Sequence, residues 1–202
     1  MIKAISQFES NRDRAKELGS IFSLVESHYP LLVPQGEEIL RAQIVLIVSA
    51  FDTFIHDCIR TGIIQSYTGL RKIGGALSSY NISFDQVSIL DHMPTINDKI
   101  NHLDNLLREK NSKDSYQSPK SIEFALGLIN VSKVWTKVSP YMHIPAVDIR
   151  NKLSLIVDRR NKIAHESDYN PITNSKYPIS KSDVNDIISF LDNLSKAIYR
   201  IL

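Results

Sequence analysis

The stretch Arg160-Asn161-Lys162-Ile163-Ala164-His165 combines side chains whose types and spacing are suited to chemistry. It places a permanently charged guanidinium, an amide and a titratable imidazole within about a turn and a half of helix. An arginine can hold a phosphate through its planar donors, and a histidine can transfer a proton near neutral pH. Together they are enough to propose cleavage of RNA without a metal, and the rest of the chain must be consistent with this chemistry.

The motif lies near the end of a helix predicted over about residues 146–165. The apolar stripe expected to face the core consists of Leu153, Ile156, Val157, Ile163 and Ala164. Arg160 lies in the middle of this stripe, where a guanidinium needs a carboxylate, a phosphate or a water-filled cleft. Asn161 and His165 are four residues apart and share the opposite, polar face with Asp158.

Arg160 and His165 are five residues apart, which corresponds to about 140° on an ideal helix. A single helix therefore presents the two side chains poorly to one small ligand. The helix can end or distort at His165, or two copies can pack their motif helices across a twofold axis and build the site jointly. We expect a combination of the two.

Structural explanations compete with this interpretation. Arg160 can form a buried ion pair, for which Asp52 and Asp57 on a central helix are the natural partners. His165 can simply place a favourable charge at the negative end of the helix dipole. Basic residues outnumber acidic ones between residues 150 and 165, so Arg159 and Lys162 are expected to contact substrate phosphates, although such runs are usually solvated helix faces.

Apolar spacing and turn residues predict a single all-α domain over residues 1–202, an up-and-down bundle of about five to six helices. The predicted helices cover about residues 3–28, 36–66, 95–109, 121–138, 146–165 and 181–201. The predicted loops cover residues 67–81, 111–120 and 170–178, which are rich in glycine, proline, serine and asparagine.

Composition limits the class of protein. The chain has 202 residues, a formal charge of +2 and one cysteine, Cys58, which excludes an internal disulfide framework. The first residues lack the design of a signal peptide, and the most apolar window, residues 44–50, is too short to span a bilayer. We therefore expect a cytoplasmic protein that does not bind membranes. The six histidines form no metal-ligand pair at short spacing, so neither a metal nor a cofactor is expected.

With these residues in view, the chain resembles the HEPN superfamily of helical RNA-binding and RNA-cutting domains. The resemblance rests on an arginine, a polar residue, a short spacer and a histidine, here Arg160, Asn161, three residues and His165. Residues 157–166 resemble the RiboL-PSP-like branch in particular. Residues 49–57, with Asp52 beside aromatic residues, are similar to the first core helix of that branch, which suggests supporting roles for Asp52 and Asp57.

The resemblance implies a metal-independent endoribonuclease that acts as a homodimer, or a catalytically silent relative that binds RNA or a protein partner. Many members belong to toxin–antitoxin, phage-defence or CRISPR-linked systems, which implies an antitoxin or defence-system protein as a partner. Cleavage would leave a 2′,3′-cyclic phosphate and a 5′-hydroxyl. The members paired with a nucleotidyltransferase usually have a tyrosine two residues after the histidine, where this chain has Ser167. A third interpretation is a helical scaffold with no nucleic-acid role.

Overall fold

The computed structural model covers residues 1–202 and describes all of them except the side chains of Ser78 and Ser79. Its backbone confirms the predicted all-α class. The eight α-helices of the described backbone are α1 (Ile2–His28), α2 (Val33–Tyr67), α3 (Phe84–His92), α4 (Ile96–Asn111), α5 (Pro119–Leu128), α6 (Val134–Met142), α7 (Ala146–Glu166) and α8 (Lys181–Ile201). Two short 3-10 helices, Pro30–Leu32 and Gly75–Ser79, and a hairpin of β1 (Tyr169–Asn170) and β2 (Ser175–Lys176) complete the described backbone.

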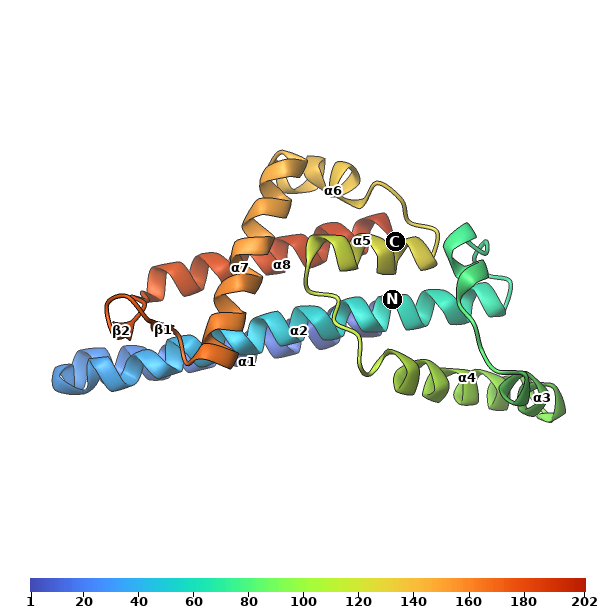
Figure 1. Ribbon diagram of the computed structural model, residues 1–202, viewed down its shortest axis with the longest axis horizontal. Coiled ribbons are helices and arrows are strands. Elements are labelled where there is room, and N and C mark those ends of the chain that lie inside the picture. Colours follow the sequence, from blue (N-terminus) through green and yellow to red (C-terminus); the bar gives the residue numbers. More distant parts are fainter.

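The two longest helices, α1 and α2, form an antiparallel hairpin, and α2 runs on beyond the N-terminus of α1 along most of the molecule (Figure 1). Pro30 and Pro34 each lie in the first turn of a helix, where the missing N–H is tolerated, and so they set the turn between α1 and α2. Close packing depends on Gly19, which faces the side chain of Gln43. The buried Gln43 amide donates a 2.7 Å hydrogen bond to the Ala15 carbonyl, which ties the two helices together.

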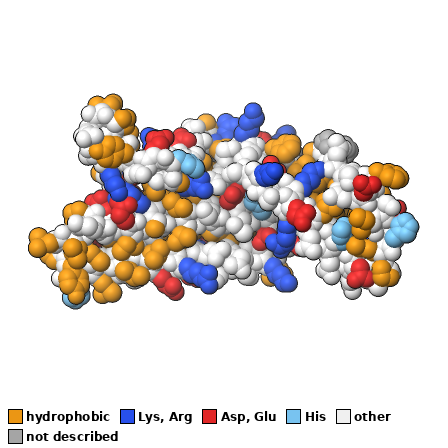
Figure 2. All heavy atoms as spheres, turned by 60° about the horizontal axis from the view of Figure 1, so that its bottom comes forward, with side chains coloured by type: hydrophobic (Ala, Val, Ile, Leu, Met, Phe, Trp, Pro, Cys, Tyr) orange, Lys and Arg blue, Asp and Glu red, His pale blue; other side chains and the backbone are white. Residues whose placement is uncertain are grey.

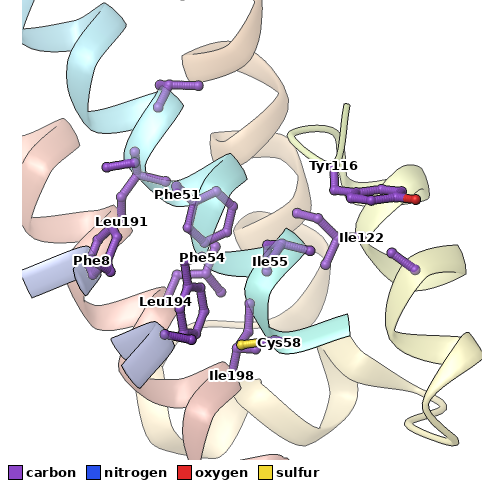
Figure 3. Close-up of a cluster of buried hydrophobic side chains, with 14 of the residues drawn as sticks. Phe8, Phe51, Phe54, Ile55, Cys58, Tyr116, Ile122, Leu191, Leu194 and Ile198 are labelled. Atoms are coloured by element: carbon purple, nitrogen blue, oxygen red, sulfur yellow. The ribbon is translucent and has the colours of Figure 1, made fainter. Parts of the chain in front are cut away.

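The core is built around α2, which has buried residues on most of its circumference and contacts α1, α4, α5, α7 and α8. Phe8 of α1 packs against Phe54 with ring centroids 5.8 Å apart, and Phe51 lies beside them (Figure 3). Cys58 is buried in the same cluster, where burial raises the pKa of its thiol far above the ordinary value. Cys58 is therefore an apolar core residue, as its position on the helix predicts.

The arrangement differs from a simple up-and-down bundle at α7. Helices α1, α2 and α8 lie along the long axis, whereas α7 runs across this direction and packs on α2 (Figure 1). Helix α6, which precedes α7, packs on both α7 and α8. The crossing places the end of the motif helix against the first half of α2.

Two predicted boundaries are wrong, and they explain why eight helices replace the expected five to six. The helix predicted over residues 121–138 is divided into α5 and α6 by a turn in which Asn130 and Lys133 have positive φ angles of 64° and 53°. Helix α3 was not predicted. It begins at Ser83, which forms a capping box with Gln86.

Helix α2 with the short turn before it, residues 30–67, is long and apolar enough to cross a membrane by length and composition. More than half of its most apolar window is buried inside the domain, as expected for the central helix of a helical core. Exposed hydrophobic side chains gather instead at the free end of the α1–α2 hairpin (Figure 2). They are Ile21, Leu24, Tyr29, Leu31 and Leu32.

Candidate active site

Helix α7 carries all residues of the sequence motif, and its core-facing side is anchored by Ile149, Leu153 and Ile156, which are fully or almost fully buried. The predicted apolar stripe is only partly confirmed. Val157 and Ile163 are half-buried, and Ala164 is exposed because the last turn of the helix extends beyond the core. The motif therefore lies where α7 passes from the core to the surface.

The helix ends one residue after His165, at Glu166, and the chain then takes a left-handed path. Ser167 and Asp168 have φ angles of 54° and 59°, a region that residues other than glycine rarely adopt. The backbone N–H of Asp168 donates a 2.9 Å hydrogen bond to the carbonyl of Lys162, which closes the end of the helix. The predicted helix end near His165 is thus confirmed to within one residue.

Arg159 was expected to contact substrate, but its guanidinium is engaged within the protein. Its Nη2 donates to Oδ2 of Asp168 at 2.8 Å and to the carbonyl of Pro178 at 3.1 Å. The guanidinium also lies 5.4 Å from the centroid of the Tyr177 ring. These contacts fix the charge of Arg159 against the hairpin that follows α7.

Asp168 is the centre of a network that the sequence pattern does not predict. Its side chain is fully buried, and the same Oδ2 accepts a 2.8 Å hydrogen bond from Nε of Arg41 on α2. Arg41 is itself only 2% exposed and donates a further 2.8 Å bond to the carbonyl of Tyr177. The signal in the sequence is an arginine beside the most apolar window of the central helix, but nothing local identifies its partner 127 residues away.

Arg160, the next residue along the helix, has different surroundings. Its Nη1 donates a 3.0 Å hydrogen bond to the side-chain carbonyl of Asn161, and its Nε is buried without a hydrogen-bond partner. Among the described residues no carboxylate lies within ion-pair distance of this half-buried guanidinium. The interpretation in which Asp52 or Asp57 neutralises Arg160 is therefore wrong.

The other two basic or titratable motif residues lie nearer to solvent. His165 is exposed in the last turn of α7, and within the described part of the chain its ring makes no hydrogen bond. Lys162 is half-buried, with Nζ 4.9 Å from the centroid of the Tyr177 ring. The structure thus brings Arg160 and Asn161 into contact and leaves His165 free on the same short segment.

Asp52 and Asp57 line a separate polar cavity of about 330 Å³ between α2 and α4. Asp52 accepts hydrogen bonds from the backbone N–H of Tyr116 at 2.7 Å and from Nε2 of Gln117 at 3.2 Å. Asp57 pairs with Arg60 at 2.7 Å. Asp52 therefore holds α2 to the segment before α5, whereas the Asp57–Arg60 pair lies within α2. Among the described residues no group of three or more His, Cys, Asp or Glu side chains is placed to hold a metal ion.

A helical domain with an arginine, a polar residue and a histidine at this spacing on its penultimate helix is of the HEPN class. The model of the RiboL-PSP-HEPN family matches residues 9–202, and the chain belongs to this family. HEPN domains are often ribonucleases, so membership indicates a nuclease-type helical module. No curated protein and no solved structure matches the chain.

Proposed function

We propose that this protein is a metal-independent endoribonuclease with Arg160, Asn161 and His165 in its active site. The observation that carries the proposal is the contrast between two adjacent arginines. Arg159 is neutralised by the buried Asp168, whereas Arg160 has no carboxylate partner among the described residues and keeps a buried, unpaired Nε–H. A buried donor without a partner is costly, and a phosphate oxygen would satisfy it.

In the proposed reaction, the 2′-hydroxyl of RNA attacks the adjacent phosphorus and the bond to the 5′-oxygen of the next nucleotide breaks. One imidazole removes the proton of the 2′-hydroxyl, and one proton is delivered to the leaving 5′-oxygen. The products are a 2′,3′-cyclic phosphate and a 5′-hydroxyl. His165 is one of the two proton-transfer groups, and its exposure gives it access to a bound strand.

Arg160 would bind the phosphate and offset the charge that develops on it in the transition state. The 3.0 Å bond to Asn161 restricts the rotation of the guanidinium, which supports a positioning role for the amide. Lys162 is a further candidate for a phosphate contact. The contacts of Arg159 support a bracing role for that residue in place of the expected contact with substrate.

A second copy of the chain would complete the site. Helix α7 stays helical through both residues, so Arg160 and His165 remain about 140° apart around one helix. A homodimer in which the ends of two α7 helices face each other would bring the arginine of one copy to the histidine of the other. RNA in the cytoplasm is the proposed substrate, and an antitoxin or defence-system protein is the proposed controlling partner.

One observation favours a second function, a catalytically silent module that binds RNA or a protein partner. The ring of His165 lacks an orienting hydrogen bond within the described residues, whereas a general base is usually held by a third group. In this function Arg160 still binds phosphate, but no proton is transferred.

The test is an RNA cleavage assay in excess EDTA with total cellular RNA and analysis of the new ends. Arg160→Ala and His165→Ala are compared with the wild type. Their matched controls are Arg150→Ala, an exposed arginine on the same helix, and His92→Ala, an exposed histidine in the last turn of α3. The proposal predicts cyclic phosphate ends that disappear in the first two variants alone.

Equal cutting by all five proteins would contradict the proposed site. Binding of RNA without cutting, lost in Arg160→Ala, would support the silent module instead.

A further inference from the structure

The carboxylate of Asp168 joins three separate parts of the molecule at the end of the motif helix. Its Oδ2 accepts from Arg41 of α2 and from Arg159 of α7, each at 2.8 Å. Its backbone carbonyl accepts a 2.9 Å hydrogen bond from the N–H of Tyr177, which follows β2. Arg41 and Arg159 in turn both donate to the carbonyl of Tyr177, at 2.8 and 3.4 Å.

The same residue also determines how α7 ends. Asp168 lies three residues after His165, and its N–H closes the last turn of the helix on the carbonyl of Lys162 at 2.9 Å. Its backbone has a φ angle of 59° after a similar angle at Ser167, and consecutive left-handed residues persist only where their surroundings hold them. The two arginine contacts provide that restraint, because they fix the buried side chain from two directions.

The network is additionally tied to the start of α2. Arg41 Nη1 lies 3.3 Å from carboxylate oxygens of both Glu37 and Glu38, and Lys176 of β2 bonds to Glu38 at 2.5 Å. The hairpin is therefore held on α2 by Asp168, which precedes β1, and by Lys176 of β2. These contacts connect α2 rigidly, through Asp168, to the last turn of α7.

We propose that Asp168 is a positioning residue of the endoribonuclease. Through its contacts with Arg41 and Arg159, Asp168 holds the turn of α7 that carries His165. The same contacts prevent Arg159 from binding the phosphate in place of Arg160. The inference rests on the proposed function. The carboxylate does not contact substrate. It acts by fixing the direction in which the His165 side chain projects from the helix. It also leaves Arg160, and not Arg159, as the arginine without a carboxylate partner.

The positioning role predicts a specific pattern in Asp168→Asn, which keeps the size of the side chain and removes its charge. Turnover at saturating RNA falls by at least about tenfold, because displacement of a proton-transfer group by a fraction of an ångström is costly. Affinity for an RNA oligonucleotide with 2′-O-methyl riboses, which cannot be cut, stays within about twofold because Arg160 and Lys162 remain.

The matched control is Asp192→Asn. Asp192 of α8 accepts from Arg12 of α1 at 2.6 Å and from Lys196 at 2.8 Å, so the substitution also removes a carboxylate shared by two cations. Its turnover and affinity per folded molecule stay at the wild-type level. The folded fraction of each protein is measured by circular dichroism at the assay temperature.

A second readout does not depend on activity. Histidine-selective isotope labelling gives six imidazole signals, and the spectrum of His165→Ala assigns that of His165. The His165 signal shifts or broadens in Asp168→Asn and stays in place in Asp192→Asn. An unchanged His165 signal, wild-type turnover, or a loss of turnover no greater than the unfolded fraction would each overturn the inference.

If none of the proteins cuts RNA, the endoribonuclease proposal fails, and the His165 signal alone still decides whether Asp168 positions that turn.

Discussion

Arg159 and Arg160 are consecutive residues with the same side chain, yet the fold gives them opposite environments. Arg159 forms an ion pair with Asp168, which also binds the buried Arg41. Arg160 points to a different side of α7, where Asn161 offers a neutral acceptor. The helix geometry, which separates neighbouring residues by about 100°, is the cause of the division.

This division predicts different costs for the two truncations. Arg159→Ala should lower the free energy of unfolding by about 1–3 kcal/mol, because a fully buried carboxylate loses one of its charged donors. Arg160→Ala should cost less than about 1 kcal/mol, since it removes no ion pair. Urea denaturation of both variants measures the difference. A larger loss in Arg160→Ala would mean that Arg160 stabilises the fold more than Arg159 does.

At this scale the sequence predicts the contiguous part of the candidate site and misses the distant part. Arg160, Asn161 and His165 lie within one stretch, so their types and spacing could be recognised directly. The partners of Arg159 could not, because Asp168 is reached through a left-handed turn and Arg41 lies on another helix. Tertiary packing determines which residues pair over such a distance in the sequence, and the local pattern of residues does not indicate it.

Pairs of helices are linked by carboxylates whose titration depends on folding. Arg60 of α2 bonds to Asp104 of α4, and Arg12 of α1 bonds to Asp192 of α8. Burial alone would raise the pKa of both aspartates, but hydrogen bonds and charges from two cations each outweigh it. The pKa of Asp104 and that of Asp192 are therefore lowered from the ordinary value of 3.8.

The lowered pKa values predict loss of stability in acid. A carboxylate with a lower pKa in the folded state contributes stability above its unfolded pKa, and the contribution disappears as the pH falls through the folded value. The midpoint temperature of thermal unfolding should therefore decrease as the pH falls below about 3.8. The decrease should be smaller in the double variant that carries both Asp104→Asn and Asp192→Asn. Asp91→Asn, at an exposed carboxylate of α3, is the control. Parallel profiles for the wild type and the double variant would contradict the assignment.

Two helical glycines predict opposite effects of the same substitution. A Cβ on Gly62 of α2 would lie 2.5 Å from Cγ2 of the buried Ile129, so Gly62→Ala should destabilise the protein by about 1–3 kcal/mol. Gly127 of α5 has no atom within 4 Å of the equivalent position. Gly127→Ala should therefore stabilise by about 0.5–1 kcal/mol through helix propensity. Equal midpoints in urea for both variants would show that α2 and the α5–α6 turn are not closely packed.

The same region shows why some elements could not be predicted. Apolar spacing continues from Ile122 to Val138, which favoured one helix, but the packing of Ile129 against Gly62 fixes a turn there. Tertiary contact outweighs local propensity in this case. Helices α1, α2 and α8, which have long apolar periods, are predicted to within a few residues because their own sequences determine both the face and the ends.

For the whole molecule, the path of α7 decides what one copy can do. Because α7 crosses the long helices, its C-terminal turn is delivered to the surface beside the first half of α2 (Figure 1). His165 is exposed there, and Arg160 is half-buried on another side of the same helix. In the proposed reaction, the arginine and the histidine of one copy therefore diverge, and a second copy would have to complete each site.

The proposed dimeric site predicts complementation between two inactive variants. In an equimolar mixture of Arg160→Ala and His165→Ala, random assembly makes half of the dimers mixed. Each mixed dimer holds one intact pair of Arg160 from one subunit and His165 from the other. Cleavage should then recover to about one quarter of the wild-type rate, although neither variant cuts alone.

Sedimentation at the assay concentrations shows whether the dimer is present, and dilution below its dissociation constant should lower the rate per molecule. Mixtures that stay inactive, with a wild-type monomer whose rate per molecule is independent of concentration, would place Arg160 and His165 of a single copy in one site. The 140° separation on α7 would then have to be bridged by the RNA strand itself, with its phosphate at Arg160 and its ribose at His165.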